Sequence, residues 1–160
     1  MAVIANKVEK LAELLLGHHW YLTAAESCTG GWLAKSCTDL AGSSGWFERG
    51  FVTYTNEAKN EMLGVEKLTI DTHGAVSEET VAEMAAGALA HSHAHIAVAI
   101  SGIAGPDGGS ESKPVGTVCF SWVVKDGESI VQTVYFNGDR EAVRHQAVEY
   151  ALDGLIELLT

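Results

Sequence analysis

The sequence predicts an α/β fold, a three-layer α/β/α sandwich in which helices cover both faces of a mixed, mostly parallel sheet with one antiparallel hairpin. Apolar residues at helical spacing alternate with short apolar runs along the chain. The run 96–100 is apolar at every position, as expected of a central strand covered on both faces. Asp126-Gly127 separates two β-rich segments and indicates a hairpin. The length of 160 residues favours a single domain over 1–160.

The first half of the chain predicts two strand-to-helix junctions behind an N-terminal helix. That helix covers about 3–16 and stops at Gly17, and a strand follows over 20–25. After a glycine-containing turn, helical spacing resumes over 33–40. A second strand over about 50–55 runs into a short helix capped by Asn56. The expected core face of the first helix consists of Ile4, Val8, Leu11, Ala12 and Leu15.

The second half predicts a helix, three strands and a final helix. Ser77 is expected to cap the first of these helices, which Gly87 should weaken only slightly. Strands follow over 96–100, 116–124 and 129–136, and Asp139 is the expected cap of the last helix. The apolar residues expected to face the core are Val81, Met84, Ala85, Ala88 and Leu89 in the first helix and Val148, Leu152, Leu155 and Leu159 in the last.

Charge and composition exclude several classes of function. Ten Lys and Arg against twenty-one Asp and Glu give a net charge of −11, which argues against a nucleic-acid partner. No apolar run approaches the ~20 residues of a membrane span, and no secretory signal precedes the first helix, so we expect no membrane partner and a cytoplasmic protein. The three cysteines form no CxxC pair, which favours reduced thiols. The histidines at 91, 93 and 95 lack neighbouring ligands, so no metal site is expected.

The first candidate site is the turn AESCTGG at 25–31. Ser27, Cys28 and Thr29 are possible nucleophiles, and Gly30 and Gly31 let backbone N–H groups approach a ligand. Such N–H groups can hold a phosphate or an oxyanion. The competing interpretation is that Ser27 or Thr29 only caps the following helix.

Two further loops are candidates for the same edge of the sheet. Lys59 lies one turn into a helix that follows Tyr54, where the helix dipole disfavours its charge and makes it a better base. The alternative is a solvated surface lysine. The loop over 101–109 is long and glycine-rich, which favours a binding loop.

Arg140 and Arg144 stand four residues apart at the start of the last helix, where both oppose the positive end of the helix dipole. Glu141 can compensate part of that charge. A bound phosphate is the functional alternative.

Five blocks of sequence resemble the CinA C-terminal domain family, and in particular its stand-alone members with nicotinamide-nucleotide amidohydrolase activity. The similarity spans essentially the whole chain. The blocks are AESCTGG at 25–31, GWFERGFVTYTNEAK at 45–59, HGAVSEETV at 73–81, SGIAGPDGGSESKPVGTV at 101–118 and GDREAVR at 138–144.

The resemblance implies hydrolysis of nicotinamide mononucleotide (NMN) to nicotinic acid mononucleotide and ammonia, without a metal or cofactor. The nucleophilic serine of the family falls on Ser27 and its lysine partner on Lys59. We expect N–H groups over 28–31 to hold the oxyanion and Tyr54 to stack on the cationic ring. Arg140, helped by Arg144 and by the loop that contains Ser101, Gly102 and Gly105, is the expected phosphate site. A homo-oligomer, such as a dimer, is also expected.

Three alternatives stay open at this point. The chain could be a non-catalytic nucleotide-sensing or interaction module, linked to the competence and DNA-damage role for which the family was named. It could act on another carboxamide nucleotide. Cys28, instead of Ser27, could be the nucleophile of a thiol amidase.

Overall fold

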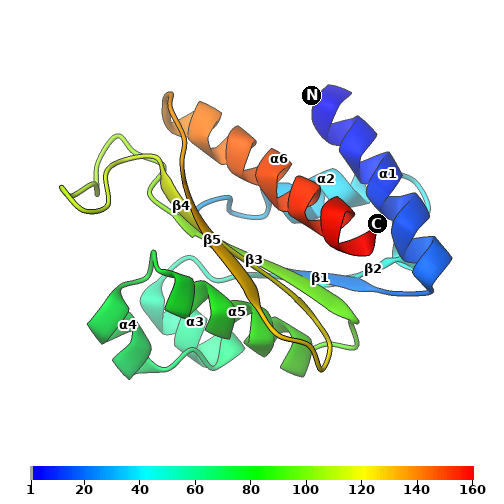
Figure 1. Cartoon of the computed structure of the whole chain (residues 1–160), viewed down its shortest axis with the longest axis horizontal. Coiled ribbons are helices and arrows are strands. Elements are labelled where there is room, and N and C mark those ends of the chain that lie inside the picture. Colours follow the sequence, from blue (N-terminus) through cyan, green and yellow to red (C-terminus); the bar gives the residue numbers. More distant parts are fainter. Residues whose placement is uncertain (1) are drawn as a thin grey trace.

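The computed structural model describes residues 2–160 as a five-stranded sheet between two layers of helices (Figure 1). A short 3-10 helix, η1 (Ser43–Gly45), precedes β2. In chain order the other elements are α1 (Ala2–His18), β1 (Leu22–Glu26), α2 (Trp32–Thr38), β2 (Phe47–Val52), α3 (Asn56–Leu63), α4 (Lys67–His73), α5 (Glu78–Ala90), β3 (Ile96–Gly102), β4 (Thr117–Val124), β5 (Ile130–Tyr135) and α6 (Arg140–Leu159).

The sheet has the strand order β2-β1-β3-β4-β5 and is mixed, as predicted. Strand β1 is parallel to β2 and to β3, whereas β4 is antiparallel to β3 and to β5. Strand β4 therefore runs against the other four, and the hairpin over Asp126-Gly127 joins β4 to β5. The apolar strand at 96–100 lies in the middle of the sheet and is buried on both faces, which confirms the prediction.

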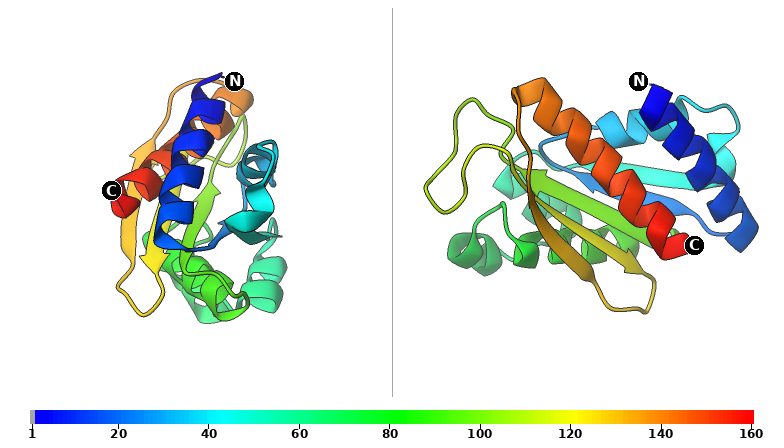
Figure 2. Two further views of the ribbon diagram at one scale, coloured as in Figure 1. Left: turned by 90° about the vertical axis from the view of Figure 1, so that its right-hand side faces the viewer. Right: turned by 45° about the horizontal axis from the view of Figure 1, so that its top comes forward.

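Side chains of different size alternate along the central strands and give the two faces different cores. Ile96, Val98 and Ile100 point to the cluster formed with α1, α2 and α6. Ala97 and Ala99 point to the cluster formed with α3, α4 and α5. Because successive side chains of a strand point to opposite faces of the sheet, β3 contributes residues to both hydrophobic clusters. The further views in Figure 2 show α1 and α6 side by side on one face of the sheet.

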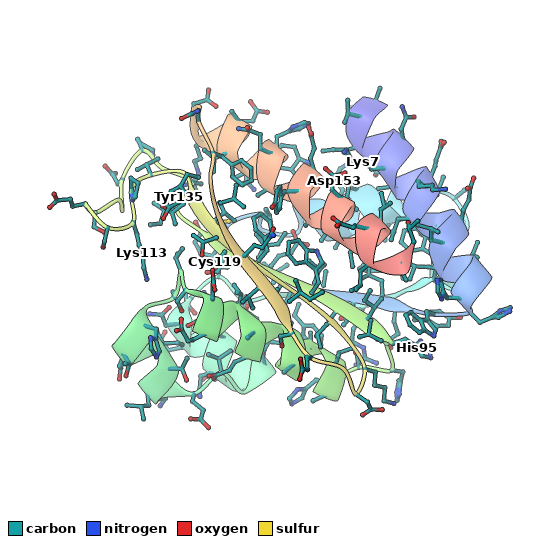
Figure 3. The ribbon with its side chains drawn as sticks, viewed as in Figure 1. Lys7, His95, Lys113, Cys119, Tyr135 and Asp153 are labelled. Atoms are coloured by element: carbon teal, nitrogen blue, oxygen red, sulfur yellow. The ribbon has the colours of Figure 1, made fainter. Side chains whose placement is uncertain are left out.

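The predicted helix faces are the buried ones. All five apolar residues expected in the first helix are buried in α1, and the four expected in the last helix are buried in α6. In α5, Val81, Met84, Ala85 and Ala88 are buried, and Leu89 packs at the edge of the same cluster. An ion pair between Lys7 of α1 and Asp153 of α6 joins the two helices where they face each other (Figure 3).

Three local predictions need correction. The second strand covers 47–52 instead of 50–55, because the chain leaves the sheet at Thr53 to reach α3. Helix α4 was not predicted at all, since its seven residues bury only Ile70 and so show no apolar stripe. The cap of α3 is Thr55, whose side chain accepts the Ala58 N–H, and Asn56 is the first residue of the helix.

Gly87 has a larger role than the slight weakening expected from helix propensity. A Cβ atom at this position would lie 2.0 Å from the carbonyl oxygen of Leu63, at the end of α3. Helices α3 and α5 can pack this closely only because position 87 carries no side chain.

We predict that Gly87→Ala lowers the free energy of unfolding by about 1–3 kcal/mol, the usual cost of overpacking a core. Gly17→Ala is the matched control, because no heavy atom lies within 4 Å of a Cβ atom there and the position is helical. Alanine should leave stability unchanged there or raise it by up to about 1 kcal/mol. Denaturant unfolding of both variants measures the difference, and equal effects at the two positions would contradict the packing argument.

Candidate active site

The carboxyl ends of β1, β2 and β3 lie together at one edge of the sheet. Glu26, the last residue of β1, is paired with Val52 of β2 and with Ile100 of β3. The chain after β1 continues into α2 on one face, and the chain after β2 continues into α3 on the other face. Connections that leave in opposite directions open a crevice at the ends of the strands, which is where open α/β sheets bind ligands.

A cavity of about 280 Å³ lies at this edge. It is formed by the ends of β1 and β3, the start of α3, the segment before α5, the glycine-rich loop and the start of α6. Eight of the residues singled out from the sequence line it: Ser27, Cys28, Tyr54, Lys59, Ser101, Gly102, Gly105 and Arg140. Four others, Thr29, Gly30, Gly31 and Arg144, lie outside its lining.

Ser27 and Lys59 form a buried pair in this cavity. The Lys59 Nζ lies 3.1 Å from the Ser27 Oγ, and Lys59 is 1% exposed. The same amine donates to the carbonyl oxygens of Thr53 at 3.2 Å and Tyr54 at 3.3 Å. The alternative of a solvated surface lysine is therefore wrong, because the turn from β2 into α3 places this residue against the end of β1.

Burial lowers the pKa of the Lys59 amine, because the charged form loses hydration in the cavity wall. The oxygens around it are hydroxyl and carbonyl groups, and no carboxylate forms an ion pair with it within residues 2–160. A neutral amine in this position can accept the proton of the Ser27 hydroxyl. Of the three candidate nucleophiles, Ser27 is thus the one that lies beside a base.

Cys28 lines the same cavity but is poorly suited to be the nucleophile. Burial raises the pKa of its thiol to about 12, against the opposing effect of the Arg144 charge. The thiolate is the reactive form of cysteine, and at neutral pH it would be scarce at this position. Its Sγ instead faces Gly102, where an added Cβ atom would lie 3.1 Å away.

The Thr29 side chain binds Glu26 instead of lining the cavity, and Glu26 performs the capping that we considered for Ser27 or Thr29. The Glu26 carboxylate is 1% exposed and accepts the N–H groups of Leu33 at 2.9 Å and Ala34 at 3.0 Å, in the first turn of α2. It also accepts the Thr29 hydroxyl at 2.7 Å. Ser27 is thereby left free of a capping role.

The two arginines of α6 have different surroundings. Arg140 lines the cavity and donates to the Gly105 carbonyl at 2.7 Å and to the Tyr54 hydroxyl at 3.0 Å. Arg144 instead donates to the carbonyl oxygens of Cys28 at 2.9 Å and Thr29 at 3.1 Å. The four-residue spacing therefore does not bring both guanidinium groups to one ligand.

Several lining residues were not singled out from the sequence. Asn56, Ala75 and Val76 contribute to the wall, whereas its one carboxylate, Asp107, belongs to the loop over 101–109 that the sequence indicated. Ala75 and Val76 connect α4 to α5, so the failure to predict α4 also hid them. The Ser101 hydroxyl donates to the Ala75 carbonyl at 2.8 Å and ties this segment to the end of β3.

The glycine-rich loop projects beyond the carboxyl edge of the sheet (Figure 1). Beyond this loop, Lys113 points toward the end of α4 (Figure 3), where its amine donates to the His73 carbonyl at 2.7 Å. This contact ties the segment between β3 and β4 to α4 outside the cavity lining.

Residues 2–160 contain no group of three or more His, Cys, Asp or Glu side chains placed to hold a metal ion. No helix among them is both long enough and apolar enough to cross a membrane.

Fold and cavity together define an α/β protein with a cavity at the carboxyl edge of its sheet. Residues 4–159 match the family model of the CinA C-terminal domain, and the chain belongs to this family. It is 59% identical over 147 residues to the nicotinamide-nucleotide amidohydrolase PncC of Escherichia coli (strain K12), an alignment that covers 92% of this chain and 89% of that protein.

Further relatives agree in sequence and in structure. The protein of the same name from Pseudomonas putida is 50% identical over 161 residues, covering 100% of this chain and 99% of the relative. The crystal structure of the competence/damage inducible protein CihA from Agrobacterium tumefaciens superposes with a TM-score of 0.94 at 42% identity, covering 99% of this chain and 96% of that one.

The lowered pKa of Lys59 has a consequence for stability. Between the folded-state pKa and that of an unfolded lysine, about 10.4, the unfolded chain binds more protons than the folded one. The free energy of unfolding therefore increases as the pH rises through this window, because the cost of burying the charged Lys59 is progressively removed. At lower pH the folded protein carries the full cost of burying the charge.

We predict that Lys59→Met is more stable than the wild type by the widest margin at pH values below the folded-state pKa of Lys59. The margin should shrink as the pH is raised toward about 10, because the amine is then neutral in the wild type as well. Denaturant unfolding at several pH values measures it, with Lys10→Met at an exposed position of α1 as the control. A stability margin that grows with pH would contradict a lowered pKa of Lys59 in the folded state.

Proposed function

We propose that this protein hydrolyses the carboxamide of NMN to give nicotinic acid mononucleotide and ammonia. The observation that carries the proposal is the buried Lys59 amine at 3.1 Å from the Ser27 hydroxyl, in a cavity at the carboxyl edge of the sheet. The names of the relatives from Escherichia coli and Pseudomonas putida, both nicotinamide-nucleotide amidohydrolases, support the substrate.

The pair suits two-step acyl transfer. The Ser27 Oγ attacks the carboxamide carbon while its proton moves to the neutral amine of Lys59, which forms a tetrahedral oxyanion. Lys59 then protonates the departing nitrogen, which leaves as ammonia, and an ester on Ser27 remains. Water attacks this ester with Lys59 again as the base, and the carboxylic acid product leaves as that proton returns to Ser27. The acid then ionises to the carboxylate, and its proton is taken up by the released ammonia. The cycle consumes one water molecule and regenerates both side chains.

The cavity offers each end of NMN a complementary group. Arg140 is the arginine in the lining and is proposed to bind the phosphate. Tyr54 is proposed to stack on the pyridinium ring, and Asp107 adds a carboxylate to the same wall, which favours a cation. Ser101, Gly102 and Gly105 are proposed to shape the floor under the substrate.

A cytoplasmic location and assembly as a homo-oligomer, such as a dimer, are also part of the proposal. Cys28, Cys37 and Cys119 are all unpaired and buried, which suits a reducing compartment. Ile130 and Tyr135 are exposed apolar side chains on the edge strand β5, a surface that a second copy could cover. Light scattering coupled to size-exclusion chromatography measures the assembly.

The first test is the release of ammonia from NMN by the purified protein and by two variants. Ser27→Ala should lower kcat by at least about a thousandfold, the usual scale for a lost nucleophile. Cys28→Ala, at the neighbouring position, should stay active. An active Ser27→Ala beside an inactive Cys28→Ala would establish a thiol mechanism instead. Binding of NMN by the wild type without ammonia release would favour the non-catalytic sensor.

The base is tested by the pH profile. Because Lys59 must be neutral to accept a proton, kcat/KM for NMN should rise with pH through a value below the ~10.4 of a free lysine. Lys59→Arg should be nearly inactive, because a guanidinium does not release its proton in this range. A profile that is flat between pH 6 and about 10, or an active arginine variant, contradicts the role.

Phosphate recognition is tested with two enzymes and two substrates. Removal of a charge-assisted contact of roughly 1.5–3 kcal/mol should lower kcat/KM of Arg140→Ala for NMN by about ten- to a hundredfold. The same substitution should hardly affect nicotinamide riboside, which has no phosphate and should already be a poor substrate. Equal losses on both substrates would assign Arg140 to the support of Tyr54 and the glycine-rich loop.

A further inference from the structure

The turn that carries Ser27 is held by charged side chains on two sides. On one side, the buried Glu26 carboxylate accepts the Thr29 hydroxyl and two N–H groups of α2. On the other side, the Arg144 guanidinium donates to the carbonyl oxygens of Cys28 and Thr29. Arg144 comes from α6, more than a hundred residues away in the sequence, and its Cζ lies 5.5 Å from the centre of a Trp32 ring.

This double attachment determines where the N–H groups of the turn point. In a planar trans peptide, the carbonyl oxygen and the following N–H point in opposite directions. Because the Cys28 carbonyl is directed at Arg144, the N–H of Thr29 is directed away from Arg144.

The N–H groups of this turn fall into two classes. Ser27 donates its N–H to the Ile100 carbonyl at 3.0 Å, and Gly30 donates its N–H to the Ser27 carbonyl at 3.0 Å. The N–H groups of Cys28 and Thr29 donate to no backbone or side-chain oxygen within residues 2–160. Two unused donors thus directly follow the nucleophile in the chain, the arrangement that an oxyanion requires.

We propose that Arg144 is a positioning residue for the oxyanion site. By holding the Cys28 and Thr29 carbonyls, it keeps the N–H of Thr29, together with that of Cys28, oriented toward the oxyanion that forms when Ser27 attacks. Its positive charge on the carbonyl side also polarises the Cys28–Thr29 peptide, which makes the Thr29 N–H a stronger donor. Arg144 does not contact the phosphate in this role, in contrast to Arg140. The inference rests on the proposed amidohydrolase function.

The proposal predicts a loss in kcat with little change in KM, because the oxyanion exists only after attack has begun. Removal of a single oxyanion donor costs about 10²–10³ in kcat in other enzymes, so misorientation of the turn in Arg144→Ala should cost about 10- to 300-fold. KM for NMN should stay within about threefold of the wild type. Nicotinamide riboside should suffer the same fold-loss in kcat, since the effect does not involve the phosphate.

Chemical rescue separates positioning from simple support of the fold. Millimolar guanidinium ion should restore part of the kcat of Arg144→Ala in a saturable manner, because it can occupy the vacated position and donate to both carbonyls. Methylammonium, a cation without the planar fork, should restore much less. Arg144→Lys should likewise stay well below the wild type, since one ammonium does not reproduce two divergent N–H bonds.

The matched control is Arg49→Ala, which also removes an arginine that donates to a backbone carbonyl, that of His91 at 3.0 Å, but outside the cavity. It should leave kcat unchanged and should not respond to guanidinium. Turnover of NMN by the wild type tests the proposed function. The ratio of kcat of Arg144→Ala to kcat of the wild type tests this inference. The inference is overturned by wild-type kcat in Arg144→Ala, by a loss confined to KM for NMN, or by a loss in kcat that guanidinium does not reverse.

Discussion

Burial of the Lys59 amine beside the Ser27 hydroxyl is the interaction on which the chemistry of this site depends. A lysine in the wall of a cavity loses hydration, and three neutral oxygens compensate that loss only in part. The resulting decrease in pKa favours the neutral form of the amine, which is the form that a base requires. An acidic partner beside Lys59 would stabilise the ammonium and remove this property, so the neutral surroundings are as important as the short distance.

The position of that amine follows from the order of the strands. Strand β1 lies between β2 and β3, so the residue after β1 is next to the residues that follow both neighbours. The chain leaves β2 at Thr53 and enters α3 at Asn56. Lys59 therefore lies in the first turn of α3, from which its amine reaches the Ser27 hydroxyl. Gly87 allows α5 to pack against the end of this helix, so a packing constraint in the second core also bears on the Ser27–Lys59 pair.

The walls of the cavity are assembled by side chains that bind backbone carbonyls of other segments. Ser101 binds Ala75 and Arg140 binds Gly105, while Lys113 binds His73 outside the cavity lining. Arg144 attaches the Ser27 turn to the last helix in the same manner. Such bonds connect parts of the chain that no strand pairing joins, and each can be removed by one substitution without loss of a core side chain.

The sequence by itself determined the α/β class, the central strand and the buried faces of α1 and α6, because apolar periodicity is local and directly expresses burial. It also indicated the Ser27 turn, Lys59 and Arg140, through glycine-rich turns and helix starts at strand ends. Only the tertiary structure decided that Lys59 is buried, that Glu26 caps α2 and that Arg144 holds a turn instead of lining the cavity. The burial of Lys59 against Ser27 and the role of Arg144 depend on contacts between segments distant in sequence, whereas the Glu26 cap depends on how the turn after β1 folds back. The polar residues that make these contacts have no periodicity to reveal their partners. Helix α4 was missed for a related reason, since a short helix that buries only Ile70 carries almost no pattern.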